Sequence, residues 1–242
     1  MNSAMRKAVL QGIHFIEANL HERIGVSDVA AAVSYSPFYF SRAFSAHAHI
    51  SVYDYILRRK ISEAYKELFS DRPRIVDLAF RYGFQSHEVF TRTFRKAFGE
   101  APSEAEEYKP LALFEPIDED YLTALSRFQV RETDKPVGSC YFELSGISSG
   151  EEPKASGSLL LLLSRENLYR CECVLEGQLA LTEAQYLFCG TGPLRQKLQI
   201  RHADTKHALR YFTDHYYAGE TMKRNYIVAN RTGDTVDIYV PE

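Results

Sequence analysis

The stretch "SHEVFTRTFRKAFG", residues 86–99, has the pattern of a short helix with one apolar face and one basic face. Its apolar residues recur at helical spacing and form one stripe that must pack on a neighbouring helix: Phe90, Phe94, Ala97 and Phe98. The opposite side is polar and mainly basic, with these members: Glu88, Thr91, Arg92 and Arg95. Ser86 suits the N-cap position, which leaves His87 in an exposed first turn. This side is either a solvated surface or a surface that reads nucleic acid.

The same pattern occurs earlier in the chain. "SPFYFSRAF", residues 36–44, and "SHEVFTRTF", residues 86–94, share Ser-x-x-x-Phe-(Ser/Thr)-Arg-x-Phe. Upstream of each copy, Asp-(Val/Leu)-Ala recurs at residues 28–30 and 77–79. Each copy therefore predicts a helix, a tight turn and a second helix. The alternative is two ordinary hairpins of a helical bundle, but in both second helices an Arg lies opposite the Phe pair, which favours two helix-turn-helix units.

The first copy has an aromatic outer face. Phe40 and Phe44 form its apolar stripe, and Ser36 followed by Pro37 fits the N-cap and N1 positions. Three side chains point outward or flank the stripe: Phe38, Tyr39 and Arg42. A major groove accepts one such helix, and Arg can donate to both O6 and N7 of guanine there. Two helices held about 34 Å apart can read two successive major-groove faces.

A long amphipathic helix is expected between the two copies. Residues 51–70 have helical apolar spacing, an N-cap at Ser51 and an end at "SDRP". The rigidity of this helix would fix the spacing of the two units. Arg58, Arg59 and Lys60 lie near its middle, where they contact phosphate or form a solvated or core-bracing cluster, two interpretations of similar weight.

The charge is distributed unevenly along the chain. The 242 residues carry a formal net charge of −3. Residues 30–99 hold 11 Lys and Arg against 6 Asp and Glu, whereas residues 111–242 hold 14 against 19. This distribution predicts an anionic partner for the first part of the chain only.

The composition narrows the class of protein. Hydrophobic residues make up 45% and charged residues 25%, as in ordinary globular proteins. No apolar run approaches the ~18 residues of a membrane span, and the N-terminus lacks a secretory pattern, so we expect a cytoplasmic protein without membrane contact. The cysteines form no Cys-x-x-Cys pair and are interpreted as free buried thiols, with no metal or cofactor: Cys140, Cys171, Cys173 and Cys189.

Three segments carry a family resemblance: "HERIGVSDVAAAVSYSPFYFSRAF", "YILRRKISEAYKEL" and "IVDLAFRYGFQSHEVFTRTFRKAFGEAPSE". Together, from about residue 13 to residue 107, they resemble the DNA-binding domain of the AraC/XylS family of bacterial transcription regulators. The resemblance implies a seven-helix, all-α, homeodomain-like double helix-turn-helix that binds asymmetric sites on double-stranded DNA, with RNA polymerase as a further partner. The expected DNA-binding residues are Phe38, Tyr39, Ser41, Arg42, Arg59, His87, Glu88, Thr91, Arg92 and Arg95.

The chain departs from this family pattern at three places. Ser34 stands where the family has Gly in the first turn, whereas the second unit keeps Gly83. A Ser with positive φ costs about 1 kcal/mol, so we expect the first turn to be shifted or looser. His49 replaces a common Gly after the first recognition helix. The family usually runs Pro-Ser-x-x-Arg after the second recognition helix, and this chain has Glu106 in place of the Arg. A final, acidic helix is still expected to start at Ser103, where Glu106 completes a capping box.

The second half changes to an α+β pattern. We expect a DNA-binding domain at residues 1–108, a linker with a short helix at 109–127, and an α+β domain with an antiparallel sheet at 128–242. The expected strands are 128–133, 136–146, 168–177, 184–193, 224–231 and 235–242. Helices are expected at about 158–165 and at 202–217, although the run of five leucines at 159–163 is itself strand-like.

Three further stretches resemble the GyrI-like effector-binding domain, which follows the DNA-binding half in Rob-type regulators: "LTEAQYLFCGTGPLRQKL", "ALRYFTDHYYAG" and "TVDIYVPE". The resemblance implies two β-α-β-β repeats, with the first helix shortened to about residues 153–167, and an aromatic-lined cleft for a small molecule. The ligand-binding residues it suggests are Phe142, Tyr186, Phe188, Tyr216, Tyr217 and Tyr226. For each of these rings the alternative role is core packing.

The residues before Tyr226 bear on the charge of the expected ligand. Members that bind cationic drugs have a Glu-x-Tyr element where this chain has Arg224-Asn225-Tyr226, so a clearly cationic ligand is not expected. We predict a DNA-binding transcription regulator modulated by a small molecule. The alternative is a constitutive DNA-binding regulator whose C-terminal domain is structural or binds protein. No acid–base or nucleophile–His arrangement has a suggestive spacing, so no catalytic residue and no enzyme activity are expected.

Overall fold

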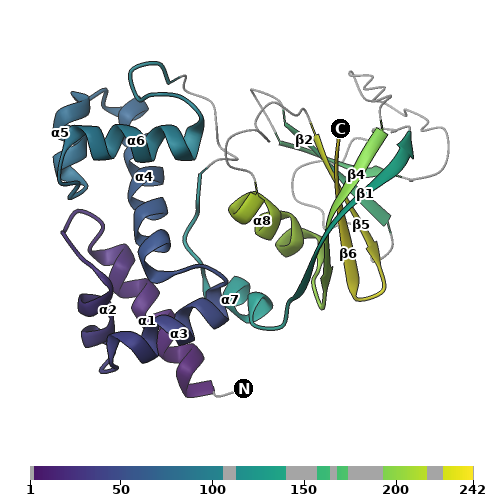
Figure 1. The fold of residues 1–242 in the computed structure, drawn as a ribbon, viewed down its shortest axis with the longest axis horizontal. Coiled ribbons are helices and arrows are strands. Elements are labelled where there is room, and N and C mark those ends of the chain that lie inside the picture. The colour runs from purple at the N-terminus through teal and green to yellow at the C-terminus, as the bar shows by residue number, and fades with distance from the viewer. Residues whose placement is uncertain are drawn as a thin grey trace. The chain divides into compact units, whose positions relative to one another are not determined.

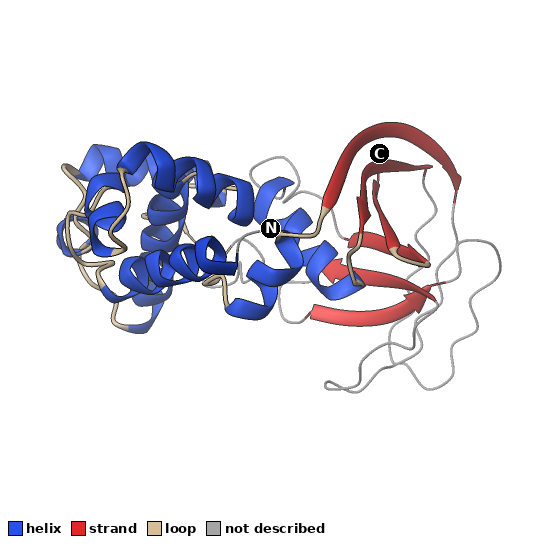
Figure 2. Cartoon of the chain, turned by 90° about the horizontal axis from the view of Figure 1, so that it is seen from below, coloured by secondary structure: helices blue, strands red, loops and turns tan. Residues whose placement is uncertain are grey.

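The computed structural model describes residues 3–105, 113–139, 157–163, 168–173, 193–216 and 226–241. The chain divides into two compact units, Met1–Ser126 and Arg127–Glu242. The first unit is helical, and the second contains the strands, as the colours of Figure 2 show. Within the described residues, no helix is both long enough and apolar enough to cross a membrane.

The first unit contains two helix-turn-helix motifs joined by a long helix (Figure 1). Its helices are α1 Ser3–Ala18, α2 Val26–Ala32, α3 Pro37–Ala48, α4 Val52–Ser70, α5 Ile75–Arg81, α6 His87–Phe98 and α7 Glu119–Leu125. The motifs are α2–α3 and α5–α6. Helix α1 packs on α2 and α3, and α4 packs on α3, α5 and α6. The predicted double helix-turn-helix is therefore confirmed.

Serine side chains start three of these helices, as predicted. The Oγ of Ser36 accepts from the N–H of Tyr39 at 3.4 Å, and that of Ser86 accepts from Val89 at 3.3 Å. Ser51 caps α4 in the same way, through the N–H of Asp54 at 3.0 Å. Each cap satisfies a backbone donor that the first helical turn leaves without a partner.

The two motifs have the same turn geometry. Ser34 has φ 61° and Gly83 has φ 71°. In the first turn the N–H of Ser34 donates to Ala31 O and that of Tyr35 to Ala30 O, both at 3.0 Å. The second turn repeats this pair of bonds at 2.9 and 3.0 Å, from Gly83 to Phe80 and from Phe84 to Ala79. The expected shift of the first turn is wrong, because Ser34 adopts the left-handed conformation instead of displacing the chain.

Two cores anchor the recognition helices α3 and α6. Phe40 and Phe44 of α3 are fully buried, and their rings pack at 5.8 Å. The second core includes the predicted stripe of α6, whose three Phe side chains are fully buried, together with residues of α4 and α5: Ile61, Ala64, Tyr65, Leu78, Ala79, Tyr82, Phe84, Phe90, Phe94 and Phe98. Each recognition helix thus has one face fixed in a core and leaves the other face outside.

Part of the segment expected to be a linker is packed into the first unit. Phe114, Ile117 and Tyr121 are 4%, 2% and 1% exposed, so residues 113–126 belong to this unit. Helix α7 packs on α3, where His49 Nε2 lies 3.0 Å from the carbonyl oxygen of Leu125. The apolar side chains of this segment are the physical reason, because they bury against the helices. Residues 106–112, where most of the expected acidic helix would lie, fall outside the described residues.

The second unit is an antiparallel sheet with a helix on one face (Figure 1). Its strands are β1 Gln129–Ser139, β2 Gly157–Leu163, β3 Leu168–Cys173, β4 Pro193–Arg201, β5 Tyr226–Thr232 and β6 Thr235–Pro241, in the order β1-β4-β6-β5-β2-β3. Helix α8, Thr205–Tyr216, packs against β5 and β6 with Leu209 and Phe212 buried. The α+β class and the antiparallel sheet are confirmed for the described residues.

One predicted helix of the second unit is wrong. The segment expected to be helical at about 158–165 forms strand β2, which pairs with β3 through Leu160 and Cys171 and with β5 through Leu160 and Val228. A run of five leucines has neither a helical nor a strand period, so its sequence fits a buried strand as well as a helix. Pairing on both sides makes β2 an interior strand of the sheet, where a continuous apolar run is expected.

Candidate nucleic-acid interface

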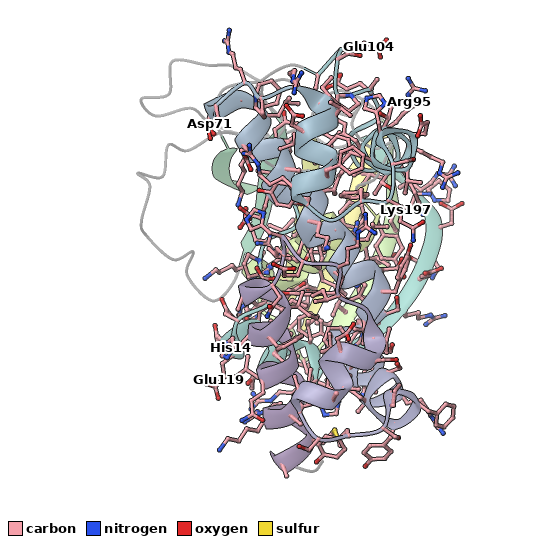
Figure 3. The ribbon with its side chains drawn as sticks, turned by 90° about the vertical axis from the view of Figure 1, so that its left-hand side faces the viewer. His14, Asp71, Arg95, Glu104, Glu119 and Lys197 are labelled. Carbon is pink, nitrogen blue, oxygen red and sulfur yellow. The ribbon has the colours of Figure 1, made fainter. Side chains whose placement is uncertain are left out.

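The outer face of α6 is basic and accessible. Arg92, Arg95 and Lys96 are exposed, as are His87 and Glu88, and Thr91 is half-buried beside them. Figure 3 shows Arg95 at the outer edge of the helical unit. Among the described residues, no carboxylate forms an ion pair with either arginine. Their guanidinium N–H groups are therefore available to acceptors outside the unit.

The first turn of α6 holds an ionised acid. A hydrogen bond from the Ser86 side chain, together with a backbone hydrogen bond, lowers the pKa of Glu88. The position also suits a carboxylate because the N-terminus of a helix carries partial positive charge. One turn further on, Thr91 Oγ1 lies 3.5 Å from His87 Nε2. Residues 87–92 thus present an acceptor, an imidazole, a hydroxyl and a guanidinium side by side.

The outer face of α3 is aromatic instead. Phe38 is 73% exposed and Tyr39 is 53% exposed, although both are large apolar side chains. The guanidinium of Arg42 lies 5.8 Å from the centre of the Phe38 ring. Tyr35 stacks on Tyr39 with a centroid distance of 5.7 Å. The structure therefore brings the predicted residues of α3 together on one accessible surface, which Ser41 borders as a half-buried side chain.

The two recognition helices offer different chemistry to a partner. Helix α6 exposes three Lys or Arg side chains and one carboxylate, whereas α3 exposes one Arg and two aromatic rings. Arg is suited to guanine, Glu to the amino group of cytosine, and apolar side chains to the thymine methyl group. A site read by both helices would be asymmetric for this reason.

Arg59 does not belong to this surface, which corrects its prediction as a DNA-binding residue. It is 2% exposed, and its Nε lies 2.9 Å from Glu17 Oε1. Its Nη2 lies 2.7 Å from Glu63 Oε1, and its Nη1 donates to the carbonyl oxygen of Phe114 at 2.5 Å. All its donor nitrogens thus face groups of the protein. The sequence left two interpretations of residues 58–60, phosphate contact or a solvated or core-bracing cluster. For Arg59 the structure supports core bracing.

Lys60 and Arg58 also have partners within the unit. Lys60 is 5% exposed and donates to backbone carbonyl oxygens of Glu22 and Tyr82. The guanidinium of Arg58 lies over the ring of Phe114, 4.9 Å from its centre. The middle of α4 therefore holds the unit together.

Residues 29–107 match the protein family described as a helix-turn-helix domain. Over 99 residues the chain is 30% identical to the regulatory protein SoxS of Escherichia coli strain K12, a match that covers 41% of this chain and 92% of SoxS. The chain belongs to the AraC family. The match with this family spans both recognition helices, as the two repeated motifs predict.

Two further comparisons also match less than half of the chain. An uncharacterized HTH-type transcriptional regulator of Bacillus subtilis, YbfP, is 41% identical over 96 residues, which are 40% of this chain and 32% of YbfP. The chain thus spans about a third of the length of this relative. A transcriptional regulator from Chromobacterium violaceum of known structure, with an AraC-type DNA-binding domain, has 25% identity and a TM-score of 0.39, with 43% of this chain and 92% of that chain covered.

The residues predicted to bind a ligand lie outside the AraC-type region, and the structure describes few of them. Phe142, Tyr186, Phe188 and Tyr217 fall outside the described residues. Tyr226 is the first residue of β5 and is paired in register with Leu162. Tyr216, at the end of α8, donates its hydroxyl to Glu132 Oε1 at 2.7 Å and stacks on Phe212. Partial burial, followed by this hydrogen bond, raises the pKa of Tyr216.

Two further residues border the recognition surface, the exposed Lys96 and the half-buried Tyr35, and neither is among the expected DNA-binding residues. Lys96 follows Arg92 by four residues, so a full count along the helical face of α6 would have included it. Tyr35 precedes α3 and reaches Tyr39 from the turn. Helical spacing does not extend through a turn, so this contact has no signal in the sequence.

Proposed function

We propose that this protein is a sequence-specific, DNA-binding transcription regulator whose helices α3 and α6 read two parts of one asymmetric site. The observation that carries the proposal is the pair of recognition helices, each fixed in a core by buried Phe residues and each with an accessible outer face of its own. Membership of the AraC family and the names of the relatives as regulators support it, and they favour a role other than catalysis.

Each outer face has a role in this proposal. Arg92 and Arg95 donate to guanine edges or to phosphates, and Glu88 accepts from a cytosine amino group or excludes sites that place a phosphate near it. On α3, Phe38 and Tyr39 contact thymine methyl groups, while Arg42 reaches a base or phosphate beside them. RNA polymerase is the partner through which a bound regulator would affect transcription.

Selection from a random duplex library tests the proposal. The full chain should enrich a defined sequence, and its affinity for that duplex should exceed its affinity for a scrambled duplex by about a thousandfold or more at physiological salt. As a control, Lys7→Ala on the exposed side of α1 should keep this ratio. Equal affinity for selected and scrambled duplexes would overturn the proposal.

We also propose that the second unit is a GyrI-like effector-binding domain that modulates DNA binding. The order β4-α8-β5-β6 supports one β-α-β-β repeat. Exchanging β1, β2 and β3 for β4, β5 and β6 maps the β1–β4 and β2–β5 pairs onto themselves and the β2–β3 pair onto the β5–β6 pair. The β4–β6 pair has no counterpart, because β1 and β3 are not paired among the described strands, but this partial twofold relation of the other pairs supports a second repeat formed by the first three strands.

A ligand screen distinguishes this proposal from constitutive regulation. The full chain bound to its selected duplex is exposed to anionic, neutral and cationic small molecules, and DNA affinity and thermal unfolding are measured. The proposal expects at least one anionic or neutral compound to change both. If compounds change neither, the second unit is structural or binds protein, and the effector proposal fails while DNA binding stands.

A further inference from the structure

A buried lysine lies where the second helix-turn-helix motif meets the segment that leads into the first. Lys60 lies near the middle of α4, the helix that joins the two motifs, and the residue is 5% exposed. Its Nζ donates to the carbonyl oxygen of Glu22 at 2.5 Å and to that of Tyr82 at 3.0 Å. Glu22 lies in the segment that leads from α1 into the first motif, and Tyr82 ends the first helix of the second motif. One ammonium group therefore joins the backbone of the segment that leads into the first motif to the backbone of the second motif.

The chain is closely packed around this ammonium group. Gly83 has φ 71°, and a Cβ at this position would lie 3.0 Å from both Glu22 O and Lys60 Nζ. The turn of the second motif at Gly83 thus approaches the segment that contains Glu22 as closely as a glycine allows. His21 covers the contact from outside, with its ring 4.7 Å from the ring of Tyr82 and its Nδ1 3.3 Å from Arg81 O.

A lysine is a costly choice for a site of this kind. Burial disfavours the charged ammonium group and lowers the pKa of Lys60. In the part of the chain that the structure describes, no carboxylate lies within ion-pair distance of its Nζ. The ammonium group offsets this cost by donating to two backbone carbonyl oxygens, which would lose this donor if an apolar residue replaced it. What an apolar residue cannot do is hold the carbonyl group of Glu22, before the first motif, and that of Tyr82, in the second motif, in one fixed geometry.

We propose that Lys60 is a positioning residue that fixes the two helix-turn-helix motifs relative to each other and so determines which spacing between the two parts of a DNA site is accepted. The inference rests on the proposed DNA-binding function. It concerns a residue that has no contact with DNA in the proposal, since its polar atom is directed at backbone. Recognition of bases remains with α3 and α6, and Lys60 acts through the position of these helices.

Spacing is a sensitive measure of this rigidity. One base pair inserted between the two parts moves one of them by about 3.4 Å along the axis and by about a tenth of a turn around it. A rigid pair of recognition helices must then deform the DNA or lose contacts, and we expect an affinity loss of about tenfold or more. If the two recognition helices can shift relative to each other at the Lys60 contact, they follow the displaced bases and the protein loses less affinity.

The experiment measures the affinity of the full chain for its selected duplex and for duplexes with one base pair inserted or deleted between the two parts. We expect Lys60→Met to bind the selected duplex within about threefold of the unchanged protein, while the penalty for altered spacing falls from about tenfold to less than about threefold. Lys66→Met is the matched control. Lys66 lies on the same helix, is more exposed, and pairs with Glu63 and Glu115 away from the junction, so its loss should leave the spacing penalty intact.

A second variant covers the case in which Lys60→Met does not fold. His21→Ala removes the exposed ring that covers the junction and should lower the spacing penalty in part, with unfolding temperature nearly unchanged. The inference is overturned if the folded Lys60→Met protein keeps the full penalty, or if Lys60→Met is unfolded and His21→Ala keeps it. It is also overturned if the unchanged protein tolerates every spacing. If the unchanged protein selects no duplex, the proposed function fails first, and the two failures are distinguishable.

Discussion

At the scale of single residues, the first motif carries backbone strain that the second motif avoids. Ser34 and His49 have φ values of 61° and 56°, and the corresponding positions of the second motif are Gly83 and Gly99, with 71° and 80°. A residue with a Cβ costs about 1 kcal/mol in this conformation, and glycine does not. The first motif keeps its geometry all the same, because its turn and helix end repeat the hydrogen bonds of the second.

Substitution of Ser34 tests this strain. Ser34→Gly should raise the free energy of unfolding by up to about 1 kcal/mol, because glycine relieves the left-handed conformation and the Ser34 side chain is exposed. Thermal and chemical unfolding measure the change. Gly83→Ala is the opposite control and should destabilise, since its Cβ would lie 3.0 Å from Glu22 O. Equal stability of Ser34→Gly and the unchanged protein would show that the first turn is unstrained.

At the scale of elements, buried ion pairs fasten α4 to its neighbours. Arg59 joins Glu17 of α1, Glu63 of its own helix and the backbone of Phe114, and Tyr55 donates its hydroxyl to Glu17 at 2.8 Å. Breaking such a network leaves a buried charge without its partner, which costs more than replacing the whole network by apolar residues. The segment at residues 113–117 therefore depends on α4 for its position.

The different costs of removing one partner and of replacing the whole network give a prediction for Glu17. Glu17→Gln should lower the free energy of unfolding by about 2–3 kcal/mol, somewhat less than for a fully isolated charge because Glu63 still faces Arg59. Arg59→Met together with Glu17→Gln should recover part of the loss. Chemical denaturation of Glu17→Gln, of Arg59→Met and of the double variant measures both effects. If the double variant were less stable than Glu17→Gln alone by the full cost of Arg59→Met, the two residues would be independent.

The start of α8 gives a pH prediction. Hydrogen bonds from His207 to the Asp204 carboxylate outweigh burial and lower the pKa of Asp204 to about 2. Because this pKa is lower in the folded state, the stabilisation is present above about pH 4 and is lost as the pH falls toward 2. With allowance for solvent screening, it amounts to about 1 kcal/mol. Asp204→Asn keeps a capping side chain and should remove this part of the acid dependence, as measured by unfolding between pH 5 and pH 2. An unchanged acid dependence would contradict the assignment.

The elements also show what a sequence can predict. Repeated Ser-x-x-x-Phe patterns locate the caps and the buried Phe residues of α3 and α6, because local spacing determines both. Arg59 was misplaced because a run of three cations faces several directions on a helix, and only the fold shows that residues 113–117 cover one of them. The five leucines of β2 were ambiguous for a similar reason, since strand pairing with β3 and β5 is not local.

At the scale of the whole molecule, the chain joins an AraC-type double helix-turn-helix to an antiparallel α+β unit. The first unit exposes cations without described partners on α6, and residues 30–99, which include both recognition helices, hold 11 Lys and Arg against 6 Asp and Glu. This local excess of basic side chains directs a polyanion to the part of the first unit that holds α3 and α6. The sequence predicts this division from composition and motifs, whereas the ligand-binding residues of the second unit stay predictions.

The central claim is that α3 and α6 read different parts of one DNA site, and base-swap measurements on two variants test it most directly. Affinities of the unchanged protein, Arg42→Ala and Arg92→Ala are measured at one salt concentration for the selected duplex and for duplexes with single base pairs exchanged. We expect each variant to lose about 1–3 kcal/mol on the selected duplex and to become insensitive to exchanges in one part only, a different part for each variant. Uniform losses across all duplexes, or insensitivity of both variants to the same part, would contradict the account.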